Sequence, residues 1–263
     1  MKKSKTIIII VVVLILIALI AVGSIFFIKS SKNKTDSEEN SSTNNSSVSS
    51  ENSTEKTSSS KRVESKDSDF DCSSSTQNTN TYAVYGYIGT DANVYNIPSM
   101  HNGKAISEIC MNAFMGKDVI EVNIPDTITK IGTMAFYDCT SLEKVTMGNS
   151  VETIEEDAFA KCESLKEIVL PNSLKEIEKF VFRDCLSLEK VIIGNGVTKI
   201  DQSAFANCPA LKEVHMGSSV TSIADGINSN PSFDDCDNVT FYAPAGSYAE
   251  SFAKENNIPF VAE

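Results

Sequence analysis

A repeat of 23 residues runs through the C-terminal half of the chain and constrains its fold more than any other feature. The stretch LEKVTMGNSVETIEEDAFAKCES, residues 142–164, is followed directly by LKEIVLPNSLKEIEKFVFRDCLS. Cysteines recur at the same place in each copy: Cys139, Cys162, Cys185 and Cys208. Self-similarity at a fixed period predicts a solenoid, in which each repeat buries its apolar residues only by stacking on its neighbours.

Each repeat contains three apolar clusters. The first opens at Val119, Leu142, Leu165, Leu188, Leu211 and, after a five-residue insertion, Val239. It continues with the alternation of a short strand that has one face inward, and a Pro or Gly then ends the strand. A second apolar pair follows, and then a Phe three residues before each cysteine. We therefore predict short parallel strands, turns and short helical segments over residues 119–238.

These units resemble the BspA-like leucine-rich repeat of bacterial surface proteins. The likeness rests on SLEKVTMGNSVETIEEDAFAKC and ALKEVHMGSSVTSIADG. YIGTDANVYNIPSMHNGKAISEICMNAF and APAGSYAESFAKENNIPFVAE resemble the entry and exit segments of that family. The resemblance implies a leucine-rich repeat solenoid with an N-terminal cap and first degenerate repeat over 81–118 and a C-terminal cap over 239–263. It also implies adhesion or contact with proteins outside the cell.

An uncharged apolar run covers residues 7–28. A helix of that length spans about 33 Å, enough for a hydrocarbon core of about 30 Å. Lysines flank the run on both sides, so the charge balance alone does not orient it. The short basic tail ahead of the run favours a single-pass signal-anchor helix in the cell membrane, with residues 1–6 cytoplasmic and the repeats extracellular. Cleavage of the run after Gly23 is the alternative.

Residues 29–80 are rich in Ser, Asn and Thr with almost no large apolar side chains, so we predict a disordered stalk. Residues 81–263 hold 13 Lys or Arg against 26 Asp or Glu, a net charge of −13. That balance lacks the basic footprint of a protein that binds nucleic acid or anionic lipid. The expected partner is therefore a protein or a glycan at the cell exterior, with membrane contact only through residues 7–28.

The periodic cysteines are predicted to be buried core thiols. Equivalent positions on neighbouring repeats lie about 4.8 Å apart with parallel side chains, whereas the Cβ atoms of a disulfide face each other at about 3.8 Å. Four tetrahedral metal ligands cannot lie on a straight ladder. A disulfide remains the less favoured alternative. Cys72, in the predicted stalk, is expected to be exposed, and its pairing is left open.

Outward positions of each strand are the candidate ligand-facing residues. Charge alternates in sign along one row, Glu143, Lys166, Glu189 and Lys212. It alternates in the opposite phase along the next, Glu121, Lys144, Glu167, Lys190 and Glu213. This checkerboard either neutralises itself to fix the register of the strands or binds a ligand. The third row combines aliphatic residues with a histidine and is the best candidate contact line: Asn123, Thr146, Val169, Ile192 and His215.

No catalytic, cofactor or metal site is predicted. Cys208 and His215 should point in opposite directions, and Asp234, Asp235 and Asp237 could hold Ca²⁺ but lack the spacing of a calcium loop. We expect a membrane-anchored extracellular binding module for adhesion or protein–protein interaction. A structural component of the cell envelope is the alternative, and an enzyme on wall or glycan polymers is the least favoured.

Overall fold

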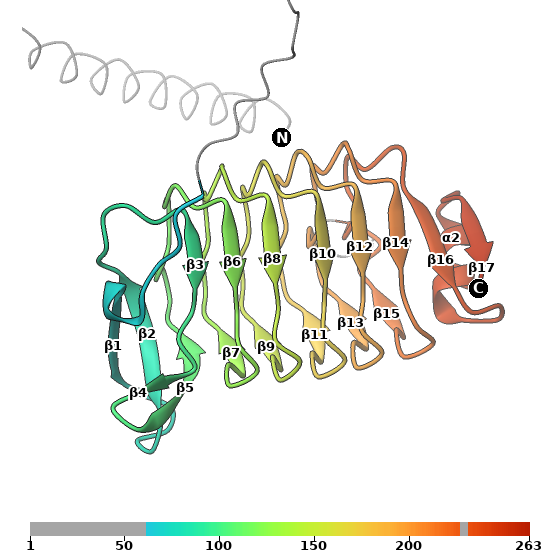
Figure 1. Ribbon diagram of the computed structural model, residues 1–263. Helices are drawn as coiled ribbons and strands as arrows, with labels where there is room; N and C mark the ends of the chain where they lie inside the picture. The colour runs from blue at the N-terminus through green and yellow to red at the C-terminus, as the bar shows by residue number, and fades with distance from the viewer. Residues whose placement is uncertain (1–61, 227–230) are drawn as a thin grey trace, which may run out of the picture. The chain divides into compact units, whose positions relative to one another are not determined.

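The computed structural model describes residues 62–226 and 231–263, which lie within one compact unit, Ser58–Glu263. Its main element is a sheet of eight parallel strands that lie side by side along the solenoid (Figure 1). In spatial order the strands are β3 (Val94–Asn96), β6 (Glu121–Asn123), β8 (Lys144–Thr146), β10 (Glu167–Val169), β12 (Lys190–Ile192), β14 (Glu213–His215), β16 (Thr240–Ala243) and β17 (Phe260–Ala262).

The 23-residue period is the register of this sheet. Ile168 pairs with Val191, and Val191 with Val214, so the central residue of each strand stacks on its equivalent. These residues point inward and are buried, as are the residues that open the repeats. The structure therefore confirms the strand pattern and the solenoid that the sequence predicts.

A second series of strands forms another side of the solenoid. β5 (Lys104–Ile109), β7 (Lys130–Ile131) and β9 (Thr153–Ile154) pair in parallel, and β11 (Glu176–Ile177), β13 (Lys199–Ile200) and β15 (Ser222–Ile223) form a three-stranded sheet. Before each of β7 to β15 the chain passes a Pro or Gly. A Cβ on Gly194 would lie 2.4 Å from the carbonyl oxygen of Pro171 in the preceding repeat. Alternation of Pro and Gly therefore lets neighbouring repeats approach closely.

The segment that carries each Phe is a run of turns, which corrects the predicted helical segments. Asp157 and Lys161 have φ angles of 57° and 60°, and equivalent residues in other repeats are also left-handed. This backbone turns alternate N–H groups toward the next repeat: the amide of Phe159 donates to the Val181 carbonyl at 2.9 Å. An α-helix would satisfy these groups internally. Among the described residues the single α-helix is α2 (Tyr248–Glu255), outside the repeats.

Aromatic rings form a continuous stack behind the turns. We call Phe114, Phe136, Phe159, Phe182, Phe205 and Phe233 the phenylalanine stack. Consecutive rings are nearly parallel, and their centroids are 5.0 to 5.6 Å apart. Offset stacking of this kind stabilises each ring pair by about 0.5–1.5 kcal/mol beyond the burial of their area.

The cysteines accompany the stack as buried, unpaired thiols, as predicted. The Sγ of Cys162 donates to the carbonyl oxygen of Phe136 in the preceding repeat at 3.3 Å, and Cys139, Cys185, Cys208 and Cys236 make equivalent bonds. All seven cysteines are free, so the disulfide alternative is not realised. Cys72 is half-buried rather than exposed, because it lies in a strand of the N-terminal cap, and burial raises its pKa to about 11.

Part of the predicted stalk is folded, which corrects its expected end at residue 80. A 3-10 turn, η1 (Asp67–Asp69), leads into β1 (Phe70–Ser74), which pairs antiparallel with β2 (Tyr82–Tyr87). β4 (Met100–His101) pairs with β5. The ring of Phe70 is 4% exposed and packs on Phe114 at a centroid distance of 6.2 Å. The first ring of the stack requires an apolar cover, and composition averaged over 29–80 concealed this single residue.

The C-terminal cap consists of β16, α2 and β17. The Oγ of Ser247 accepts a hydrogen bond from the Glu250 amide at 3.3 Å and caps the start of α2. Ala249, Phe252 and Ala253 of this helix are buried against the core. The cap thereby covers the last repeat, as the resemblance to an exit segment implies.

The predicted membrane segment, residues 7–28, lies outside the described residues, as do residues 1–6 and 29–61. Within 62–226 and 231–263, none of the helices combines the length and apolar character that crossing a membrane requires.

We predict that Phe70→Ala lowers the free energy of unfolding by about 3–5 kcal/mol, because it leaves a cavity against the first ring of the stack. Urea unfolding followed by circular dichroism measures this loss. Val63→Ala is the control, since Val63 lies nearby but is 37% exposed, and it should cost less than about 0.5 kcal/mol. Equal losses in the two variants would show that residues 62–74 do not cover the core.

A second prediction concerns the thiols of the repeats. Burial raises the pKa of both Cys139 and Cys185 to about 12, so neither supplies thiolate near neutral pH. In a Cys72→Ser/Cys110→Ser background, a chromogenic disulfide reagent should react only after denaturant is added. Labelling of the native protein within seconds would contradict the buried position of these thiols.

Candidate functional site

The open face of the eight-stranded sheet carries all of the predicted ligand-facing residues. Register pairs join Asn123 to Thr146, Val169 to Ile192, and Ile192 to His215. The row extends at both ends to residues that the sequence analysis missed. We define the outward row as Asn96, Asn123, Thr146, Val169, Ile192, His215, Tyr242 and Val261.

The additional members lie in the caps, where the spacing of the repeat changes. Val214 lies three residues after the opening Leu211, but its partner Phe241 lies only two residues after Val239. A shift of one residue reverses the faces of a strand, so Tyr242 takes the outward position. Alternation within TFYA was the available signal, since Phe241 and Ala243 are both buried.

Most of the checkerboard neutralises itself. Lys144 pairs with Glu121 at 2.8 Å, Lys190 with Glu213 at 2.9 Å, and Lys212 with Glu189 at 2.9 Å. Each pair joins neighbouring repeats, and each contributes up to about 1 kcal/mol at the surface. The structural interpretation of the two charged rows is therefore correct for these six residues.

Glu121 differs from the other members because it is buried, which corrects its expected outward exposure. Arg62, from the predicted stalk, binds its carboxylate together with Lys144. The hydrogen bond from Lys144, supported by Arg62, holds the pKa of Glu121 below its ordinary value. The first residues of the described chain thus close the N-terminal end of the charged row.

Three charged side chains in the middle of the face remain without ion pairs. Among the described residues, Glu143, Lys166 and Glu167 have no opposite charge within 4.0 Å. They adjoin Val169, which is 51% exposed. We call these four residues the central patch. Contact with a partner would break no existing ion pair here, in contrast to the flanking repeats.

A groove of about 450 Å³ continues from Val169 along the outward row. Ile192, His215 and Glu263 line it, together with Asn172 and Asn195 of the adjoining turns. The ring of His215 stacks on Tyr242 at a centroid distance of 4.5 Å, and its Nδ1 lies 3.2 Å from a carboxylate oxygen of Glu263. The groove therefore combines aliphatic, aromatic and amide groups.

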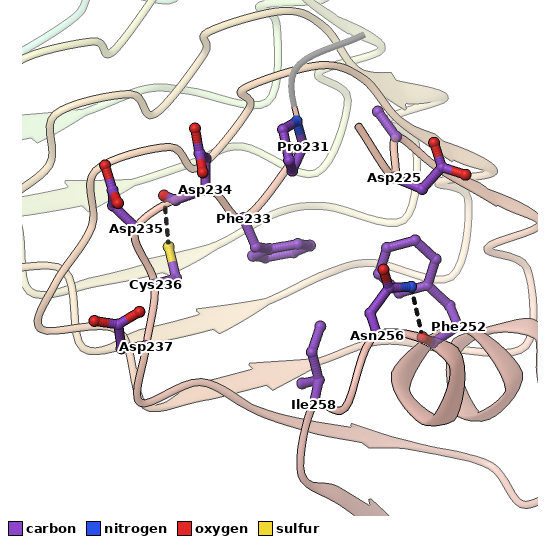
Figure 2. Close-up of a pocket in the computed structure, with 11 residues that line it drawn as sticks. Asp225, Pro231, Phe233, Asp234, Asp235, Cys236, Asp237, Phe252, Asn256 and Ile258 are labelled. Carbon is purple, nitrogen blue, oxygen red and sulfur yellow. Dashed lines mark hydrogen bonds between the residues drawn. The ribbon is translucent and has the colours of Figure 1, made fainter. Parts of the chain in front are cut away.

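The other predicted alternatives for chemistry find no support in the arrangement. Cys208 is fully buried beside the phenylalanine stack, whereas His215 lies on the open face, so the two do not form a nucleophile and base. Figure 2 shows the side chains of Asp234, Asp235 and Asp237 directed to different sides of their loop. No group of three His, Cys, Asp or Glu residues in the described ranges is arranged to hold a metal ion.

Comparison with known proteins now bears on this geometry. The model of the BspA type leucine rich repeat region matches six copies over residues 107–240, more than half of the chain. The chain belongs to this family. A solenoid of this kind is a protein-interaction module built from repeats. No curated protein sequence matches the chain significantly.

Several solved structures share the fold. The leucine rich repeat protein of T. pallidum is 26% identical with a TM-score of 0.63, and the match covers 76% of this chain and 100% of that one. A leucine-rich repeat protein of Bacteroides capillosus is 25% identical, with 56% and 94% covered and a TM-score of 0.41. A leucine rich cell surface protein of Faecalibacterium prausnitzii is 17% identical, with 78% and 96% covered and a TM-score of 0.41.

Proposed function

We propose that the chain is a membrane-anchored protein of a bacterial cell surface whose repeats bind a partner protein outside the cell. The apolar run at residues 7–28, with its short basic tail, supports the anchor. Membership of the BspA-type family supports a binding role, for which adhesion is the specific form proposed. The net charge of −13 over residues 81–263 favours neither nucleic acid nor anionic lipid as the partner.

The single observation that carries the binding role is the central patch beside the groove. Eight strands at about 4.8 Å spacing extend the open face to about 34 Å, a length that suits a protein partner. Pairing neutralises the outer repeats, whereas Glu143, Lys166 and Glu167 keep their charges free next to exposed Val169. Free charges around an aliphatic centre give a partner both orientation and apolar contact.

The proposed location is tested on cells that produce the full chain with a C-terminal epitope tag. If the repeats lie outside the cell, protease added to intact cells should remove the tag, while a tagged cytoplasmic protein survives. A tag that is degraded only after cell lysis would contradict the orientation.

The proposed surface is tested by binding of the full chain to immobilised fibronectin, laminin and collagen. Lys166→Glu/Glu167→Lys and Val169→Asp should each weaken a positive interaction by at least about tenfold, because they alter the centre of the contact. The matched controls are Glu152→Lys/Lys175→Glu, exposed outside the face, and Leu186→Asp, which is 39% exposed. Equal losses in variants and controls would exclude the central patch as the contact. If none of the three proteins binds, adhesion to matrix is excluded.

A further inference from the structure

The phenylalanine stack ends differently at its two ends. At the N-terminal end Phe114 is fully buried, and the rings of Phe70 and Tyr95 lie 6.2 and 5.5 Å from it. At the C-terminal end Phe233 is only partly buried, although the five rings before it are fully buried. Phe205 stacks on it at 5.2 Å, and Phe241 meets it at an angle of 61°. Among the described residues no second parallel ring covers Phe233.

A cavity of about 220 Å³ opens beside Phe233 (Figure 2). Phe252 and Ile258 of the C-terminal cap and Pro231 form apolar walls, and Asn256 lies at the same site. The amide nitrogen of Asn256 donates to the Phe252 carbonyl at 2.9 Å, which holds that wall in place. A cavity of about 150 Å³ lined by apolar side chains is enough to bind benzene. The space beside Phe233 therefore admits one flat ring.

Charge around the cavity restricts what kind of ring can enter. Asp225, Asp234, Asp235 and Asp237 lie among its lining residues, and the described lining contains no Lys, Arg or His. Figure 2 shows the carboxylates of Asp234, Asp235 and Asp237 directed away from the ring of Phe233, at the margin of the site. The margin thus supplies a negative field without taking the place of a ligand, so it attracts cations and repels anions.

We propose that this cavity binds a small aromatic amine, whose ring stacks on Phe233 in the place of a further member of the phenylalanine stack. Phe252 and Ile258 enclose the ring, and the ammonium group lies toward the carboxylates at the margin. The site is separate from the open face of the sheet, so it does not depend on the proposed function of that face.

Tryptamine is the probe for this site, because the chain contains no Trp and indole fluorescence therefore reports on the ligand alone. Adding the full chain should raise the fluorescence anisotropy of tryptamine, with a dissociation constant on the order of 1 mM for so small a ligand. Indole-3-acetate, the matched anion, should bind at least about tenfold more weakly, and added salt should narrow that difference. Detergent without protein is the blank.

Variants of the cavity separate this site from adventitious adsorption. Ile258→Phe fills the cavity and should abolish binding, and Phe233→Ala should weaken it about tenfold through loss of the stacked face. Tyr85→Ala, an exposed ring in β2 of the N-terminal cap, is the control and should leave binding unchanged. If melting curves show that Ile258→Phe is unfolded, Ala224→Leu on the lining of the same cavity replaces it.

Neutralising the margin tests the charge selectivity independently. Asp234→Asn/Asp235→Asn/Asp237→Asn should keep the binding of neutral indole and bring tryptamine and indole-3-acetate to within about threefold of each other. The proposal is overturned if tryptamine shows no change in anisotropy, if Ile258→Phe binds as the parent chain does, or if the cation and anion bind the parent chain equally.

Discussion

Hydrogen bonding between successive repeats is the constraint on which the rest of the structure depends. A single turn of this chain buries no core of its own, since its strands contain only two or three residues in the repeats. Stacking pairs the strands, aligns the phenylalanine rings and brings each thiol to the Phe carbonyl of the preceding repeat. Because every repeat must meet both neighbours in this way, the period of 23 residues extends to the backbone as well as to the side chains.

The ends of such a stack are where the repeat fails, and they are solved in different ways. At the N-terminus, Phe70 covers the first ring while Arg62 binds Glu121 at the edge of the charged row. At the C-terminus, α2 and β17 close the core but leave Phe233 facing a cavity. The proposed aromatic site thus arises from incomplete closure of the same stack that stabilises the repeats.

The open face of the sheet is free to vary because the core does not depend on it. Alternation places every second strand residue outward, where ion pairs between repeats neutralise most of the charge. Where pairing stops, at Glu143, Lys166 and Glu167, the face changes from a self-neutralised surface to one available for contact. A periodic scaffold therefore presents a local, non-periodic site.

The sequence by itself determined the solenoid, its register, the buried thiols and the three outward rows, because all of these follow from one period and from alternation within a strand. It also identified the charged checkerboard, but not which charges pair, since long side chains choose among neighbours at similar distances. Only the tertiary structure decided that the Phe segments form turns, that Phe70 belongs to the core, and that a one-residue shift turns Tyr242 outward. Those outcomes depend on contacts between non-equivalent residues at the ends of the stack and on backbone bonds between repeats, which no periodic pattern contains.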